Sequence, residues 1–332
     1  MLGNRWLCRG GSCLIIGQSG AGKSSLEMQL AILWALERPA FGICPAKPLK
    51  SLIIQAENDL GDIAEMFQGV WLGLKMPGTE KPEVIKQAQE NIVIRTIDSH
   101  TGAEFCHVLR RLIDRYKPDL VWLDPVLAYI GDDISKQSVC SQFFRNSLNP
   151  IAKATGVIWM ILHHTGKPPK DPKSKSAWNL GDFSYDGIGS SDLTNWARAV
   201  MVLHRFDDKL FELKLPKRGG RAGARDANGH ATKSIWIKHA EQGICWEQTD
   251  APTEEETEKA KSKYKAARKP PSTDFEIETF LESIKGEHFS LNQLAERIAK
   301  TSKMCERTAW RNVIPELKQK MHFDQEFKTY SA

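Results

Sequence analysis

The sequence predicts an α/β protein, in which a doubly wound and mostly parallel sheet is followed by a small helical module. Short apolar runs that end in turn residues alternate with stretches whose apolar residues recur at helical spacing. This alternation is typical of β-α-β units, which build parallel sheets covered by helices. Residues 273–332 depart from it and contain mainly helical patterns.

The apolar runs place the elements in order along the chain. Strands of the parallel sheet are expected at residues 12–16, 51–56, 91–97, 119–124 and 156–164. Helical spacing predicts helices at residues 25–38, 103–116 and 139–154. Three later runs are expected to be antiparallel hairpin strands, at residues 199–206, 211–215 and 234–239.

Composition indicates an ordinary globular protein. The 332 residues are 41% hydrophobic and 26% charged, with a net charge of +5, which suits one α/β domain and a second small module. Seven scattered cysteines without a CxxC pair favour reduced thiols over a disulfide framework or a zinc site. With no signal peptide or long apolar run, we expect a cytoplasmic protein without membrane association. The first strand begins soon after Met1, so an upstream segment of a longer chain is left open.

Changes in composition divide the chain into three predicted parts. These are an α/β domain, a charged linker, and a winged-helix or helix-turn-helix-like module, at residues 1–249, 250–272 and 273–332. The linker begins acidic, becomes basic and ends at two prolines. In the module, Ser290 and Gln293 predict a capping box, and Pro315 is expected to interrupt the last helix.

A glycine-rich turn, GQSGAGKS at residues 17–24, joins the first strand to the first helix. In this P-loop pattern, backbone N–H groups turn inward around phosphate oxygens at a helix N-terminus. Lys23 is expected to reach the β- and γ-phosphates of ATP, and the Ser24 hydroxyl to ligate Mg²⁺. The residues expected to bind ATP here are Gly17, Gln18, Ser19, Gly20, Ala21, Gly22, Lys23, Ser24 and Ser25.

Hydrolysis also requires carboxylates and a group that responds to the γ-phosphate. Asp124 ends the fourth strand and is the candidate metal ligand, while Glu57 follows the second strand and is the candidate base. A structural or capping role for Glu57 stays open, and Asp59 is its nearest competitor. His163 and His164 end the fifth strand and point to opposite faces. We favour His164 as the γ-phosphate sensor, against a satisfied core histidine.

Five motifs together resemble the RepA-type hexameric helicases and the wider group of RecA-like P-loop ATPases of plasmids, phages and mobile elements. The resemblance covers residues 1–247 and rests on AEND after the second strand, LDP, HHTGK, GSSDLTNWARA at 189–199 and KRGGRAG at 217–223. It implies a RecA-like fold, a hexameric ring of identical subunits, and a second strand that adjoins the first, with Glu57 facing the γ-phosphate.

The resemblance also implies an ATP site shared between subunits. By motif match, Arg198 would be the arginine that a neighbour supplies to the transition state. Lys217 and Arg218 resemble a basic pair that reaches across the same interface. For Arg198, a helix-surface salt bridge is the alternative. Pro125 stands after Asp124, where the family often has a second acid or a threonine.

Single-stranded DNA is the expected track. Residues 167–175 carry four lysines against one aspartate, and Trp178, Phe183 and Tyr185 follow them. Lysines contact phosphates and aromatic rings stack on unpaired bases, although a solvated loop without a ligand is the alternative. A second basic run covers residues 214–238.

The terminal module has a basic stretch that fits a DNA-recognition helix, or a surface that docks a replication partner protein. Its cations are Lys303, Arg307, Arg311, Lys318 and Lys320.

Taken together, the sequence predicts an ATP-hydrolysing, Mg²⁺-dependent motor on DNA, a replicative-type helicase of a mobile element or prophage. The alternatives are an ATP-dependent loader, a recombinase-like or regulatory ATPase without unwinding activity, and a sequence-specific DNA-binding protein whose ATPase controls assembly.

Overall fold

A computed structural model describes residues 1–75, 81–165, 191–258, 276–302, 309, 313–324 and 329–331. Two compact units divide the chain, Met1–Pro252 and Thr253–Ala332. Most of the expected DNA loop, with its lysines and aromatic residues, lies outside the described residues, as does the basic half of the linker. Within the described part, no helix is both long and apolar enough to cross a membrane.

The first unit is built on one nine-stranded sheet, in the order β3-β2-β4-β5-β1-β6-β7-β8-β9. The first six strands in this order are parallel and the remaining junctions are antiparallel. The bounds are β1 Ser12–Gly17, β2 Ser51–Gln55, β3 Ile92–Thr96, β4 Leu120–Asp124, β5 Ile158–His164, β6 Ala199–Arg205, β7 Leu210–Lys217, β8 Ser234–His239 and β9 Trp246–Gln248. The predicted fold class, a RecA-like α/β sheet that is doubly wound and mostly parallel, is confirmed.

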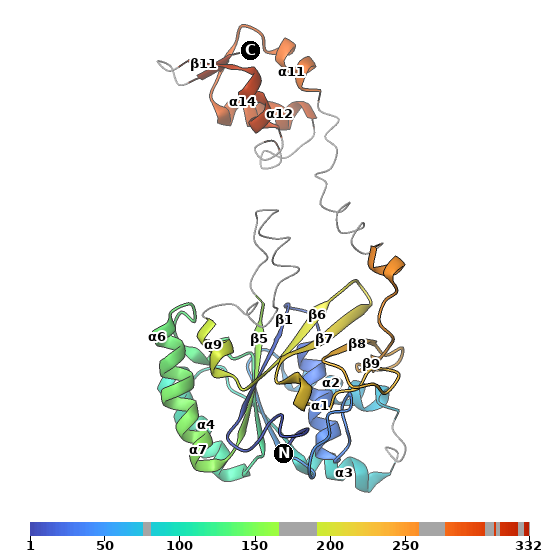
Figure 1. Cartoon of the computed structure of the whole chain (residues 1–332). Coiled ribbons are helices and arrows are strands. Elements are labelled where there is room, and N and C mark those ends of the chain that lie inside the picture. The colour runs from blue at the N-terminus through green and yellow to red at the C-terminus, as the bar shows by residue number, and fades with distance from the viewer. Residues whose placement is uncertain are drawn as a thin grey trace. The chain divides into compact units, whose positions relative to one another are not determined.

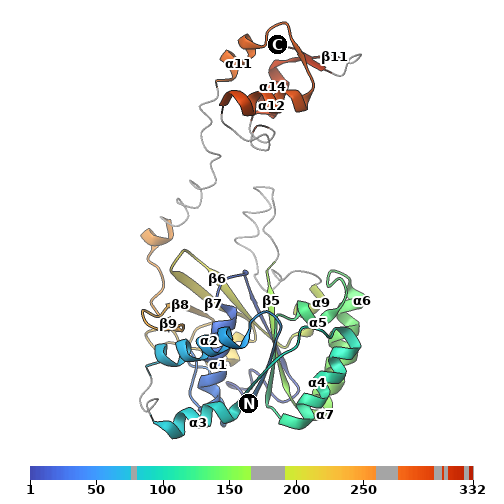
Figure 2. The same ribbon diagram turned by 180° about the vertical axis from the view of Figure 1, so that it is seen from behind.

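Helices cover both faces of this sheet (Figures 1 and 2). One face carries α1 Lys23–Ala35, α2 Leu60–Gly73 and α3 Pro82–Asn91. The other carries α4 Gly102–Tyr116, α5 Leu127–Ile130, α6 Gln137–Cys140, a π-helix Ser141–Leu148, α7 Asn149–Thr155 and α9 Ser191–Trp196. The helix predicted at 139–154 is therefore an α-π-α run, in which Pro150 stands in the first turn of α7.

Alternation along the central strands supplies two separate cores. On β1, Cys13 and Ile15 pack toward α1, while Leu14 and Ile16 pack toward α4 and α7. All four side chains are buried, and burying one such isoleucine or leucine stabilises the fold by about 1.5–3 kcal/mol. Both faces of β1 are thus fixed, which holds the P-loop at its end in place.

Two expectations about strand neighbours are wrong. The second strand does not adjoin the first, because β4 and β5 lie between β2 and β1. The run at 199–206 was expected to pair only in antiparallel hairpins. Instead, β6 pairs in parallel with β1 on one edge and antiparallel with β7 on the other. Helical crossovers let consecutive strands skip over one another, so sequence order does not determine which strands pair.

The second unit has helices α11 Ile277–Ser283, α12 Leu291–Ser302 and α14 Ile314–Lys320, with a three-stranded antiparallel sheet. Its strands are β10 His288–Phe289, β11 His322–Asp324 and β12 Thr329–Ser331. Helices with a small antiparallel sheet are compatible with the winged-helix-like module, which stays a prediction.

Of the two local predictions in this unit, the Ser290 capping box is confirmed and the helix interruption at Pro315 is wrong. The capping box forms, because the Ser290 N–H donates to Gln293 Oε1 at 2.8 Å and the Gln293 N–H to Ser290 Oγ at 3.4 Å. Pro315 begins α14 instead of interrupting a helix, because a first-turn proline needs no amide partner. Lys318 and Lys320 lie on α14, whereas Lys303, Arg307 and Arg311 lie outside the described residues.

Candidate nucleotide-binding site

The carboxyl ends of four adjacent parallel strands bring the predicted nucleotide-site residues to one edge. In spatial order, β2 leads to Glu57, β4 ends at Asp124, β5 ends at His164, and β1 leads into the P-loop. Gln55 pairs with Asp124, and Gly17 pairs with His164. Ligands bind outside the carboxyl ends of strands in open α/β sheets, so this edge is the candidate nucleotide site.

Glycine is required at the end of the P-loop for two reasons. Gly22 is the N-cap of α1 and has a left-handed φ of 84°. A Cβ at this position would lie 2.6 Å from Cζ2 of Trp246, closer than non-bonded carbon atoms approach. The turn after Gly22 leaves the first N–H groups of α1 without helical acceptors, which makes a site for phosphate oxygens. Gln18, Ser19 and Gly20 are exposed ahead of it, and Ala21 is buried.

Lys23 is held ready at this edge by three acceptors. Its side chain is 5% exposed, and Nζ donates to Gly17 O at 3.0 Å, Gln18 O at 2.8 Å and His164 Nδ1 at 3.1 Å. Burial lowers the pKa of Lys23, while Asp124 and Glu57 oppose that shift. All three ammonium protons are therefore used within the P-loop and β5, so binding a phosphate requires Lys23 to exchange partners.

Ser24 and Asp124 present adjacent oxygen ligands. The Ser24 hydroxyl donates to Asp124 Oδ2 at 2.6 Å, and Asp124 is buried. Burial raises the pKa of Asp124 against the opposing effects of Ser24, Glu27 and Lys23. A buried carboxylate beside a hydroxyl fits Mg²⁺, which is bound through one or two protein oxygens plus waters and phosphates. Ser24 and Asp124 would hold the ion.

The sequence reasoning missed a second acid at this position. Glu27 lies on α1, is 3% exposed, and lies close enough to Asp124 for each carboxyl group to affect the pKa of the other. Burial, followed by the charge of Asp124, raises the pKa of Glu27 well above its usual value. Glu27 is the only charged residue between Lys23 and Glu37. A lone acid in an otherwise apolar helix directly after the P-loop was the signal that could have found it.

Ser25 contributes differently from Ser24. Its hydroxyl donates to Gly22 O at 2.9 Å and accepts the Trp246 indole N–H at 3.2 Å. These bonds occupy the Ser25 side chain, so its N–H is the group left for a phosphate.

Glu57 lies at the same edge, although its strand is three positions from β1. It is exposed, and it follows Ala56, whose N–H donates to Asp124 O at 3.2 Å. Its charge raises the pKa values of Lys23, Asp124 and His164, so it lies within electrostatic range of all three.

Asp59 is engaged elsewhere. It is the N-cap of α2 and accepts the Asp62 N–H at 2.9 Å, and Asp62 returns the bond at 3.2 Å. This capping box engages the Asp59 carboxylate, whereas the exposed Glu57 takes no part in it.

The two histidines that end β5 have different surroundings. His163 is completely buried, whereas His164 is half-buried against Lys23. Burial, and then the charge of Lys23, lowers the pKa of His164. Its ring is therefore neutral near pH 7, and a neutral Nδ1 can accept the proton that Lys23 donates.

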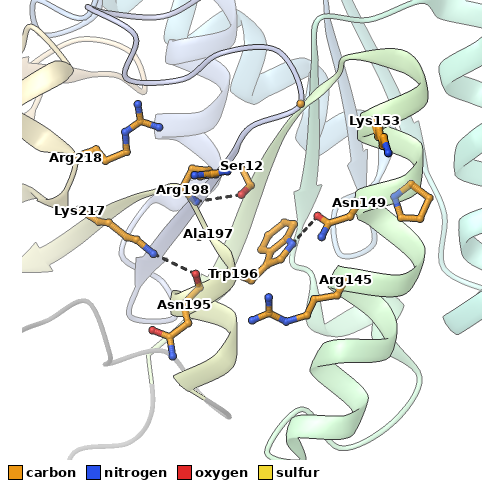
Figure 3. A pocket seen from close by; sticks show the side chains of 12 residues that line it. Ser12, Arg145, Asn149, Lys153, Asn195, Trp196, Ala197, Arg198, Lys217 and Arg218 are labelled. Carbon is orange, nitrogen blue, oxygen red and sulfur yellow. Dashed lines mark hydrogen bonds between the residues drawn. The ribbon is translucent and has the colours of Figure 1, made fainter.

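Arg198, Lys217 and Arg218 lie together, but away from the P-loop. They line a cavity of about 950 Å³ at the amino end of β1 (Figure 3). There the Arg198 N–H donates to Ser12 O at 3.0 Å and to Ser12 Oγ at 3.2 Å, and Figure 3 draws the second bond. Arg145 and Lys153 complete its five cations, and none of its twelve described lining residues is acidic. Asp192 lies beyond the lining and pairs with Arg145 at 2.8 Å.

Backbone carbonyls position two of the cations in this cavity, Lys217 and Arg218. Lys217 Nζ donates to Thr194 O at 2.9 Å and Asn195 O at 3.3 Å. Burial, and then the charge of Arg198, lowers the pKa of Lys217. Arg198 itself is exposed at the start of β6, and its guanidinium forms no ion pair within the described part of the chain. Five gathered cations with one neighbouring acid, Asp192, are suited to an anion.

Comparisons with known proteins found a matching family and a similar solved structure. The AAA domain family matches residues 1–170. Among solved structures, the chain is similar to the flagellar accessory protein FlaH from Methanocaldococcus jannaschii, at 13% identity and a TM-score of 0.45, over 74% of this chain and 92% of that one. No curated protein sequence matches. The family match covers more than half of the chain and includes the P-loop, Glu57 and Asp124, so the chain belongs to the AAA domain family and is a RecA-like P-loop ATPase.

Proposed function

We propose that the protein is an ATP-driven motor on single-stranded DNA, a replicative-type helicase of a mobile element or prophage. It would act as a homo-oligomeric ring, of hexameric type, with ATP and Mg²⁺ bound at the junctions between subunits. The observation that carries this proposal is the separation of the P-loop from the basic cavity around Arg198.

The separation follows from the direction of β1. Arg198 is bonded to Ser12 at the start of this six-residue strand, and the P-loop begins at Gly17. Five strand steps span about 16 Å, which is farther than an arginine side chain extends. Arg198, Lys217 and Arg218 therefore cannot complete their own chain's nucleotide site. They can meet the phosphates of a neighbour, where an arginine stabilises the charge of the transition state.

Each residue of the candidate nucleotide site has a separate role in the proposed hydrolysis. Mg²⁺, held by Ser24 and Asp124, would neutralise phosphate charge. Lys23 would leave the P-loop carbonyls and His164 for the β- and γ-phosphates. Glu57 would orient and deprotonate the attacking water, since it is an exposed acid at this edge and takes no part in a helix cap.

His164 connects the site to the expected DNA loop. When Lys23 turns to phosphate, His164 loses its bond and can respond to the γ-phosphate. It ends β5, directly before the stretch that carries the lysines. A shift at His164 would thus reach the segment proposed to hold DNA, and the terminal module would dock DNA or a replication partner.

The first experiment is a mass measurement with and without ATP, followed by ATP hydrolysis with and without single-stranded DNA. We expect ATP-dependent assembly and DNA-stimulated hydrolysis. Strand separation on a tailed duplex distinguishes a helicase from a loader or regulatory ATPase, which would hydrolyse ATP without unwinding. A monomer whose hydrolysis ignores DNA would contradict the proposal.

The second experiment removes four lysines from the proposed track. Each lost phosphate contact should reduce the log–log salt slope of single-strand binding by about 0.7. Basal hydrolysis should survive and stimulation by DNA should disappear. Unchanged affinity and slope would exclude this loop and move the search to residues 214–238. The substitutions are Lys167→Ala, Lys170→Ala, Lys173→Ala and Lys175→Ala.

A further inference from the structure

An aromatic cluster lies beside the P-loop at the carboxyl edge of the sheet, and phosphate binding does not use it. It contains Phe211 of β7, His239 at the end of β8 and Trp246 at the start of β9. Strand β8 runs in the same direction as β1, because two antiparallel junctions separate it from β6. His239 therefore ends at the same edge as the P-loop.

Trp246 is fixed against the start of α1. Its ring contacts Gly22, and its indole N–H donates to Ser25 Oγ at 3.2 Å. Its backbone forms a two-point pair with Gln29, in which Trp246 N donates to Oε1 at 2.7 Å and Nε2 donates to Trp246 O at 2.9 Å. Trp246 is 2% exposed, so it is a rigid support attached to the phosphate-binding turn.

His239 covers this support and faces solvent. Its ring centroid lies 4.0 Å from that of Trp246, with 34° between the ring planes, and 5.2 Å from Phe211. His239 is exposed although it contacts two buried aromatic rings. One face of the imidazole is thus held by the cluster, and the other remains accessible.

The route of a nucleotide leads toward this ring. The first N–H groups of α1, at Ser24 and Ser25, are the position for the α-phosphate, while the γ-phosphate end lies toward Lys23, His164 and Glu57. The base must extend away from that end. β5, β4 and β2 lie on the γ-phosphate side of β1, and β6 to β9 lie on its other side. The base would extend toward β6 to β9, where Trp246 donates a hydrogen bond to Ser25.

We propose that the exposed face of His239, supported by Trp246, is the stacking platform for the purine base of the bound nucleotide. This proposal rests on the proposed ATPase function and adds the residue that recognises the base. Stacking on an aromatic ring is favourable for any base, and a ring that is already immobilised loses little freedom on binding.

The charge state of the ring supports this role. Burial, and then the cation of Arg205, lowers the pKa of His239. The ring is therefore neutral near pH 7 and acts as an aromatic surface. Arg205 ends β6 at the same edge and is paired with Asp208 at 2.7 Å.

The test separates the base from the phosphates. Calorimetry would compare the binding of ATP and of inorganic tripolyphosphate, which has no base, to wild type, His239→Ala and His239→Phe. His230→Ala is the matched control, since His230 is also exposed but precedes β8, at the other end of that strand. Melting of each unliganded variant checks its fold.

We expect His239→Ala to weaken ATP binding about fivefold or more, as one lost base stack does. Binding of tripolyphosphate should not change, His239→Phe should restore ATP affinity, and His230→Ala should match wild type. The proposal is overturned if His239→Ala binds ATP as wild type does, or if tripolyphosphate binding falls equally. This assay measures binding alone, so its outcome does not depend on turnover. Wild type that binds ATP tightly here but does not hydrolyse it in a separate ATPase assay would refute the proposed motor function and not the stacking platform.

Discussion

Replacing Arg198 with alanine tests whether each nucleotide site is shared by two subunits. Arg198 extends from the amino end of β6 beside Ser12, on the opposite edge of the sheet from Lys23. Its guanidinium is exposed, so the substitution should change the free energy of unfolding by no more than about 0.5 kcal/mol. ATP affinity should remain, because every P-loop contact stays in place.

The size of the effect follows from the role of the missing charge. An arginine supplied by a neighbour accelerates phosphoryl transfer about 10³- to 10⁵-fold, and Arg198→Ala should lose that factor. Lys23→Ala should be inactive for the complementary reason, since its own phosphate site has no cation. In a random one-to-one mixture, about one quarter of head-to-tail junctions combine an intact Lys23 with an intact Arg198.

The assay is steady-state ATP hydrolysis by each variant alone and by the pair after mixing. We expect the mixture to recover up to about a quarter of wild-type activity per site, whatever the ring size. Subunit exchange must be shown separately, with differently labelled chains. Exchange without recovered activity would refute the trans role, and wild-type hydrolysis by Arg198→Ala alone would exclude any role in catalysis.

Three further substitutions, two of them with a matched control, test the carboxyl edge. Glu57→Gln should bind ATP but stop turnover, whereas Asp59→Asn should affect mainly the start of α2; normal hydrolysis by Glu57→Gln would assign the base elsewhere. Gly22→Ala should lower the free energy of unfolding by more than Gly229→Ala, as denaturant melts would show. Both glycines have a left-handed φ, which costs about 1–3 kcal/mol for other residues. Only Gly22 also contacts Trp246. Equal losses of unfolding free energy would mean that this contact adds nothing. The pKa of His164 is lowered from 6.5 in the folded chain, so its contribution to stability is complete above that pH and is lost as the pH falls below it. His164→Asn should therefore lose less stability than wild type between about pH 7 and pH 5, and an identical loss would refute this assignment.

The candidate nucleotide site could be located from the sequence because its signals are local. The P-loop glycines, Lys23 and Ser24 are contiguous, and their strand-turn-helix setting follows from apolar runs that flank them. Asp124 and His164 could be assigned because each ends a short apolar strand, and the carboxyl ends of parallel strands meet at one edge. The Ser290 capping box was readable for the same reason, since it spans a single turn.

Contacts between distant segments were decided only by the tertiary structure. No local pattern shows that β4 and β5 separate β2 from β1, because helical crossovers allow several strand orders. The buried contact of Glu27 with Asp124, and the support that Trp246 gives to Gly22, join residues far apart in the chain. Such pairings depend on which apolar faces pack together over the whole sheet. The sequence by itself determined the local chemistry of phosphate binding, whereas packing decided which distant side chains surround it.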